Sequence, residues 1–124
     1  MEKTSKKILI VEDDKSYRWI LEQSFIVAGF SVAIAEDGEK GLALAEAENP
    51  DIILLDILMP KMDGIEVARQ IKQKGIKIPV IFLTNMGDLD HITKAMEAIQ
   101  ADYIIKSNVP VDKIVERVKN KLGV

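Results

Sequence analysis

Polar residues capable of chemistry follow the short apolar runs of this 124-residue sequence. They are Glu12, Asp13, Asp14, Asp56, Thr84 and Lys106. Carboxylates, a hydroxyl and one ammonium group together make a typical site for a hard cation and a phosphoryl group. The residue types therefore favour phosphoryl chemistry, provided that the fold brings them to one place.

Closely spaced carboxylates at such a site repel one another, and the repulsion raises a pKa or destabilises the fold unless a cation lies among them. Mg²⁺ prefers oxygen ligands, and two carboxylates with one backbone carbonyl would leave coordination positions open for a phosphoryl oxygen. Asp56 can then act as a nucleophile, since carboxylates form acyl phosphates. For Asp14 and Asp37 a simpler role stays open, because an acid at a strand end often caps the next helix.

Five short runs rich in apolar and β-branched residues recur along the chain, each too short for a helix. They span residues 6–11, 31–35, 51–56, 78–84 and 102–106. Apolar residues recur at helical spacing within residues 17–28, 42–45, 65–71, 89–99 and 111–122. This alternation predicts a doubly wound α/β domain, with helices on both faces of a five-stranded parallel sheet. The carboxyl ends of its strands, where the polar residues lie, should meet at one crevice.

Length and composition set limits on function. The 124 residues suffice for one domain, expected to span residues 1–124, and 48% hydrophobic with 30% charged residues is typical of a globular protein. A net charge of −3 gives nucleic acid no general attraction, so direct nucleic acid binding is not expected. The absence of cysteine suits a reducing compartment, and no apolar stretch is long enough for a membrane span. We therefore expect a cytoplasmic protein without membrane contact.

Four motifs carry a resemblance to a known family. LIVEDD at 9–14, LLDILMPKMDG at 54–64, FLT at 82–84 and DYIIK at 102–106 occur in the order and approximate spacing of that family. With them, nearly the whole chain resembles a response-regulator receiver domain of two-component signalling, of the single-domain chemotaxis type. The resemblance implies a flavodoxin-like (βα)5 fold with strand order 2-1-3-4-5.

The resemblance also implies roles for the site residues. Asp56 would accept a phosphoryl group from a phosphohistidine on a sensor histidine kinase or a phosphotransfer protein. Asp13, Asp56 and the Leu58 carbonyl would bind Mg²⁺ directly, with Mn²⁺ as a substitute, while Glu12 would act through water. Lys106 would contact the phosphoryl oxygens. The chain would then not be an enzyme in its own right, beyond Mg²⁺-dependent self-phosphorylation at Asp56 and slow self-dephosphorylation.

Thr84 and Tyr103 match the switch residues of that family. The Thr84 hydroxyl would move toward the phosphoryl group, and inward rotation of Tyr103 would reshape the face made by the fourth helix, fifth strand and fifth helix. A half-buried aromatic at a strand end is the simpler interpretation of Tyr103. The switched face would bind a downstream protein target, and phosphorylation-dependent homodimerisation through it is a further hypothesis.

The sequence departs from the family pattern at three positions. Ser107 follows Lys106 where the family usually has a proline after a cis bond. A cis bond before serine would cost about 3 kcal/mol, so we expect a trans bond or a rearranged loop there. Asn85 replaces a small residue and should narrow access to Asp56. Ile99 replaces a helix-ending glycine, so the fourth helix must end by another route.

Leu58 and Met86 each lie two residues beyond a site residue, Asp56 and Thr84 respectively. A polar side chain at such a position could hold a hydrolytic water, and neither residue can hydrogen-bond one. We therefore expect slow autodephosphorylation.

Three other classes of protein compete with this interpretation. A flavodoxin-like FMN carrier needs a phosphate-binding loop after the first strand, where this chain has EDDKS, and its acids would repel the phosphate. A haloacid-dehalogenase-type phosphatase needs a second Asp two residues after its nucleophile, where Leu58 stands. A phosphate-independent pseudo-receiver that serves as a protein-binding module stays open, because of Asn85 and Ser107.

Overall fold

The computed structural model describes residues 5–85 and 101–124. Its elements are β1 (Lys7–Val11), α1 (Lys15–Val27), β2 (Ser31–Ala35), α2 (Gly38–Glu48), β3 (Ile52–Asp56), α3 (Gly64–Gln73), β4 (Val80–Thr84), β5 (Asp102–Ile105) and α5 (Val111–Leu122). The predicted helix within residues 89–99, and with it Ile99, lies outside the described residues. Strands and helices alternate through the rest of the chain, as the sequence pattern predicts.

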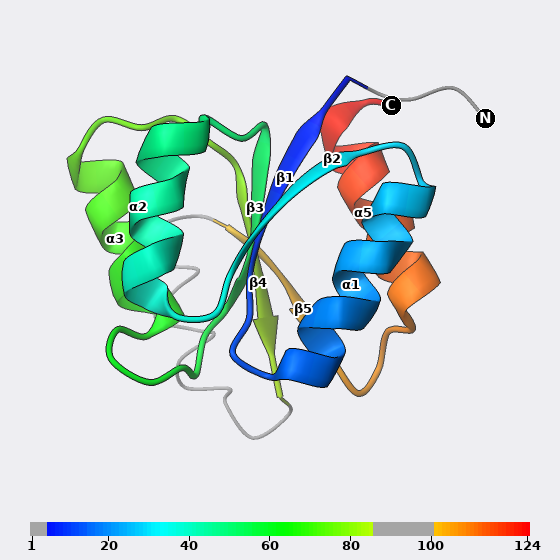
Figure 1. The fold of residues 1–124 in the computed structure, drawn as a ribbon, viewed down its shortest axis with the longest axis horizontal. Helices are drawn as coiled ribbons and strands as arrows, with labels where there is room; N and C mark the ends of the chain where they lie inside the picture. The colour runs from blue at the N-terminus through cyan, green and yellow to red at the C-terminus, as the bar shows by residue number, and fades with distance from the viewer. Residues whose placement is uncertain (1–4, 86–100) are drawn as a thin grey trace.

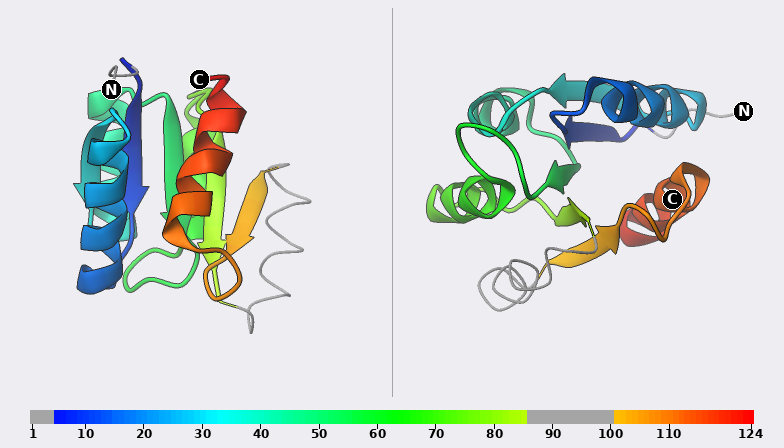
Figure 2. Two further views of the ribbon diagram at one scale, coloured as in Figure 1. Left: turned by 90° about the vertical axis from the view of Figure 1, so that its right-hand side faces the viewer. Right: turned by 90° about the horizontal axis from the view of Figure 1, so that it is seen from below.

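The strands form one parallel sheet in the order β2-β1-β3-β4-β5, which confirms the predicted topology (Figure 1). Helices α2 and α3 cover one face of the sheet, and α1 and α5 cover the other (Figures 1 and 2). All four strand pairs are parallel, so the carboxyl ends of the five strands lie at the same end of the sheet. In the part of the chain that the structure describes, no helix is both long and apolar enough to cross a lipid bilayer.

The two faces of the sheet bury two separate apolar cores. In β1, Leu9 and Val11 pack into the core beneath α2 and α3, whereas Ile8 and Ile10 pack into the core beneath α1 and α5. β3 is buried at every position because it lies near the middle of the sheet. Strands covered on both sides have no solvent face, and this explains why these runs are continuously apolar and do not alternate with polar residues.

Aspartates begin three of the helices. The carboxylates of Asp14, Asp37 and Asp63 accept hydrogen bonds from the third backbone N–H that follows each of them, at 3.1, 2.9 and 2.9 Å. These bonds satisfy N–H groups that have no partner within the helix. The structure therefore assigns Asp14 and Asp37 to capping, and Asp14 starts α1 directly after the acidic pair Glu12 and Asp13.

Candidate functional site

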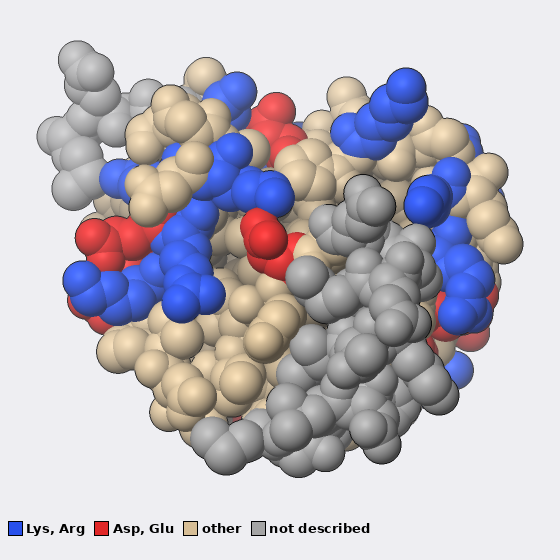
Figure 3. Space-filling model, turned by 180° about the vertical axis from the view of Figure 1, so that it is seen from behind, with Lys and Arg blue, Asp and Glu red and all other residues tan. Residues whose placement is uncertain are grey.

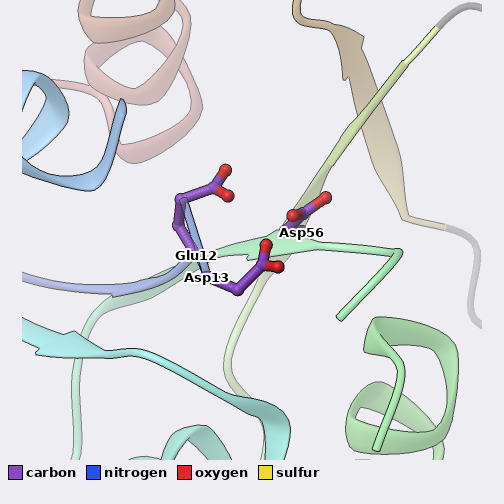
Figure 4. Close-up of side chains that lie close together, drawn as sticks. All are labelled: Glu12, Asp13 and Asp56. Atoms are coloured by element: carbon purple, nitrogen blue, oxygen red, sulfur yellow. The ribbon is translucent and has the colours of Figure 1, made fainter. Parts of the chain in front are cut away.

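Three carboxylates converge at the carboxyl ends of the two adjacent strands β1 and β3. Val11 lies in register with Leu55, so Glu12, which follows β1, comes beside Asp56, the last residue of β3. Glu12, Asp13 and Asp56 each offer an oxygen within 4.8 Å of the other two (Figure 4). The sequence-predicted clustering of these acids is present in the fold.

Lys106 reaches the same point from the end of β5. Its Nζ lies 2.6 Å from Oε1 of Glu12 and 3.3 Å from Oδ2 of Asp56, and its side chain is 16% exposed. Its backbone N–H donates to the Thr84 carbonyl at 2.8 Å, which extends the β4–β5 pairing by one residue. The described residues contain no cis peptide bond, so the bond to Ser107 is trans, as predicted, and Lys106 still faces Asp56.

The charges of the site are unequally exposed. Glu12 is fully buried and Asp56 is 4% exposed, whereas Asp13 faces solvent. Burial, together with the Glu12 carboxylate, raises the pKa of Asp56 from 3.8 to about 8, although Lys106 lowers it. For Lys106 itself, burial lowers the pKa, but its contacts with Glu12 and Asp56 raise it more. The ammonium group of Lys106 contacts two carboxylates of a cluster of three and does not balance their charge.

The donor set suits a hard cation. All three neighbouring side chains offer carboxylate oxygens, the ligands preferred by Mg²⁺ and Mn²⁺. One of these oxygens, Oε1 of Glu12, is buried and makes the ion pair with Lys106 but no well-oriented hydrogen bond within the described residues. The other, Oε2, accepts the backbone N–H of Asp14 at 3.0 Å, which fixes the Glu12 side chain. The residues present thus fit a divalent ion.

A cavity opens above these groups. Its lining residues are Glu12, Asp13, Asp14, Tyr17, Asp56, Leu58, Asn85, Lys106 and Ser107. Leu58 is 46% exposed beside the acids, and Asn85, the residue expected to narrow access to Asp56, lies at the rim. Met86, paired with Leu58 in the sequence analysis, lies outside the described residues. Asp56 is one of the lining residues of this cavity, although only 4% of its surface is exposed.

The loop after β3 is tightly packed against the site. The backbone N–H of Gly64 donates to the Ile57 carbonyl at 2.8 Å, and that of Ile57 donates to the Leu83 carbonyl at 3.1 Å. A Cβ added to Gly64 would overlap the carbonyl oxygen of Asp56 and lie 2.9 Å from Cα of Ile57. The first residue of α3 therefore touches the backbone of Asp56 and restricts its position.

The two predicted switch residues lie on β4 and β5. Thr84 is fully buried, and its hydroxyl donates to the Asn85 carbonyl at 3.2 Å. Tyr103 pairs with Phe82 across the sheet and is 39% exposed, so its ring is accessible from solvent. Asp102 and Lys121 line a pocket together with Tyr103, and their side chains form an ion pair at 2.8 Å. Figure 3 shows acidic and basic side chains interspersed on the back of the molecule as it is drawn in Figure 1.

Sequence reasoning missed one residue of the site. The sequence pattern places Tyr17 at the start of the apolar stripe within residues 17–28, and its side chain does pack against the core beneath α1 and α5. The structure also places its ring against Lys106, with Nζ at 5.0 Å from the ring centroid. The sequence does hold a signal for this role. Tyr17 lies in the first turn of a helix that begins directly after the acidic pair, and such a position is close to the crevice.

Comparison with known proteins agrees with this geometry. The family model of the response regulator receiver domain matches residues 8–119. The alkaline phosphatase synthesis transcriptional regulatory protein PhoP of Bacillus subtilis is 38% identical over 106 residues, which is 86% of this chain and 44% of that protein. The DNA-binding transcriptional regulator NtrC of Salmonella typhimurium is 39% identical over 99 residues, 80% of this chain and 21% of that protein. The chain thus spans less than half the length of these curated relatives.

Solved structures show the same fold. A CheY-like response regulator receiver domain protein from Methanospirillum hungatei superposes with a TM-score of 0.88 at 30% identity, covering 97% of this chain and 95% of that one. The receiver domain of the Francisella response regulator 1452 superposes with a TM-score of 0.84 at 28% identity, covering 93% and 94%. These likenesses extend over nearly the whole of each chain.

Proposed function

Because this chain belongs to the response regulator receiver domain family of two-component systems, we propose that Asp56 is its phosphoacceptor. One observation carries the proposal. The buried Asp56 carboxylate ends its strand at an open cavity, 3.3 Å from the Lys106 ammonium and beside Glu12 and Asp13. Groups that could serve as a nucleophile, as a cation for phosphoryl oxygens and as metal ligands thus lie close together, which supports the proposal.

The acidic cluster would hold the divalent ion that the family uses. Asp13 and Asp56, with the Leu58 carbonyl, would bind Mg²⁺ directly, Glu12 would act through water, and Mn²⁺ would substitute. When bound, the ion supplies positive charge that offsets the carboxylates and the incoming phosphoryl group. The excess of carboxylates over ammonium groups within the described site supports this assignment.

In the proposed transfer, an Asp56 oxygen attacks phosphorus while the bond from phosphorus to the donor histidine nitrogen breaks. The product is an acyl phosphate on Asp56 and a free imidazole on the donor. Lys106 would contact the phosphoryl oxygens, since its ammonium already lies between Glu12 and Asp56. This step and a slow hydrolysis are the only reactions proposed, so the chain acts as a signalling domain and not as an enzyme on other substrates.

Phosphorylation would act on the output face through Thr84 and Tyr103. The Thr84 hydroxyl, now bonded to the Asn85 carbonyl, would turn toward the phosphoryl group, and the exposed Tyr103 ring would rotate inward. A local change of charge would thus bias a two-state element. The altered face is proposed to bind a downstream protein target.

The proposed donor is a sensor histidine kinase or a phosphotransfer protein in the cytoplasm. PhoP and NtrC are named as transcriptional regulators, but the matched part is less than half of each. We therefore assign no DNA contact to these residues, in keeping with their net charge of −3.

Acetyl phosphate with Mg²⁺ tests the proposal directly. The intact protein should gain the mass of one phosphoryl group, and the gain should disappear in Asp56→Ala. Asp112→Asn, in the first turn of α5, is the matched control and should be phosphorylated as the wild type is. Failure of the wild type to gain mass would instead favour the phosphate-independent binding module, the alternative suggested by Asn85 and Ser107.

A further inference from the structure

The ring of Tyr17 lies against the ammonium group of Lys106. Nζ is 5.0 Å from the ring centroid, within the distance at which an aromatic ring attracts a cation. Tyr17 is held there by the start of α1, where its backbone N–H donates to Oδ1 of Asp14 at 3.1 Å. The capping aspartate thus sets the position of the ring relative to the site.

The Lys106 side chain needs such a restraint. Its backbone is fixed by the bond to the Thr84 carbonyl, and its ammonium is fixed by Glu12 and Asp56. Between these points run four flexible methylenes, and the residues that follow, Ser107 and Asn108, are exposed in a turn. The two carboxylates and the Tyr17 ring are therefore the contacts that limit where the ammonium can move.

We propose that Tyr17 is a positioning residue for phosphorylation, whose ring holds the Lys106 ammonium between Glu12 and Asp56. The inference rests on the proposed function for its effect on rate, but the contact between Tyr17 and Lys106 is independent of it. Tyr17 does not touch the reacting atoms in this proposal and acts through Lys106.

The aromatic ring of Tyr17 positions Lys106, and the hydroxyl group is not needed for this. The Tyr17 hydroxyl is buried and makes no hydrogen bond within the described residues. Burial also raises the pKa of Tyr17, which keeps the phenol neutral. Phenylalanine retains the attractive face of the ring and removes only the unbonded hydroxyl, so it should replace tyrosine without loss. Leucine retains apolar packing but removes the ring.

The test compares initial rates of Asp56 phosphorylation by acetyl phosphate and Mg²⁺. Tyr17→Phe should be phosphorylated at the wild-type rate. Tyr17→Leu should be phosphorylated about fivefold more slowly, the value expected for the loss of one partly desolvated cation–π contact. Trp19→Leu removes a 60% exposed aromatic from the same helix and should leave the rate unchanged. In a Lys106→Met background, Tyr17→Leu should cause no further loss, because residues that act as a unit are not additive.

A second readout uses the metal-free protein and needs no phosphorylation. The Tyr17 ring should shift the NMR signals of the Lys106 methylene protons; Tyr17→Phe should keep this shift and Tyr17→Leu should abolish it. If Tyr17→Leu does not fold, Tyr17→Met takes its place in both measurements.

Three results would overturn the inference. Tyr17→Leu could be phosphorylated at the wild-type rate, or Tyr17→Phe could lose as much of the phosphorylation rate as Tyr17→Leu does. Alternatively, Tyr17→Leu could slow phosphorylation as much in the Lys106→Met background as in the wild type. Absence of phosphorylation in the wild type would refute the proposed function instead, and the NMR comparison would still decide the Tyr17 contact.

Discussion

At the residue scale, Asp56 is subject to opposing effects. Burial and the Glu12 carboxylate favour its protonated form, and Lys106 favours its charged form, with a net rise of the pKa from 3.8 to about 8. Between these two values the folded metal-free protein binds a proton that the unfolded chain releases. Its free energy of unfolding therefore falls as pH rises through this window.

This linkage predicts a pH-dependent effect of metal. A divalent ion must displace the Asp56 proton, so it binds more weakly at pH 6 than at pH 8. The rise in melting temperature caused by Mg²⁺ should therefore be larger at pH 8, as measured by thermal unfolding across a series of Mg²⁺ concentrations. Asp13→Asn should remove the Mg²⁺ dependence at both pH values, and it can stabilise the metal-free protein by relieving repulsion. An equal Mg²⁺ effect at pH 6 and pH 8 would contradict the prediction.

Leu58 leads to a second prediction at this scale. Its side chain is 46% exposed at the site cavity and cannot hydrogen-bond a water molecule near Asp56. Leu58→Asn should shorten the lifetime of the acyl phosphate severalfold, as measured by loss of the phosphoryl mass after removal of acetyl phosphate. Leu58→Met keeps the position apolar and is the control, with a lifetime like that of the wild type. An unchanged lifetime in Leu58→Asn would remove the role assigned to this position.

At the scale of elements, the junction of β3 and α3 couples the fold to the site. Gly64 is the first residue of α3, and it has no space for a Cβ beside the backbone of Asp56 and Ile57. Alanine would favour the helix by about 1 kcal/mol over glycine. The clash opposes that gain, and because it involves backbone atoms, a side-chain rotation cannot relieve it.

We therefore expect Gly64→Ala to be destabilising. The loss should be about 1–3 kcal/mol in the free energy of unfolding measured with urea, and phosphorylation by acetyl phosphate should be slower because the Asp56 backbone must shift. Gln73→Ala, at the exposed end of the same helix, is the control and should change neither quantity appreciably. A Gly64→Ala protein that is more stable than the wild type would show that the helix tolerates the shift.

At the scale of the whole molecule, two buried cores hold the sheet, and part of the proposed output face, at β5 and α5, is open to solvent. The face around β5 and α5 exposes Tyr103 and the ion pair of Lys121 with Asp102. Exposed ion pairs contribute little to stability, so these charges are available for a partner. A second copy of this chain is one such partner under the dimerisation hypothesis.

Light scattering with and without acetyl phosphate tests that hypothesis. Phosphorylation should raise the average molar mass toward that of a dimer, and Lys121→Glu should lower this response without preventing phosphorylation of Asp56. Lys74→Glu, beside α3 on the other face of the sheet, is the matched control and should dimerise as the wild type does. A constant molar mass on phosphorylation would exclude the dimer.

The sequence by itself determined the strand positions, the parallel α/β class and the polar residues at the strand ends. Local patterns suffice for this, because a strand buried on both faces must be continuously apolar. In a parallel α/β sheet, functional residues lie at the carboxyl ends of such strands. The trans bond after Lys106 was also predictable, since the cost of a cis bond depends on the local residue type.

Only the tertiary structure decided the detailed contacts of these polar groups and their protonation. From the sequence, Asp14 could be a residue of the site or the cap of the following helix. The hydrogen bond from the Tyr17 N–H to its carboxylate shows that it caps α1. Tyr17 and Lys106 meet because α1 and β5 pack around the same crevice, and no local pattern encodes that contact. The raised pKa of Asp56 likewise comes from burial and from Glu12, which directly follows the neighbouring strand β1. Such quantities depend on distances between segments remote in sequence, and these distances exist only once the chain has packed.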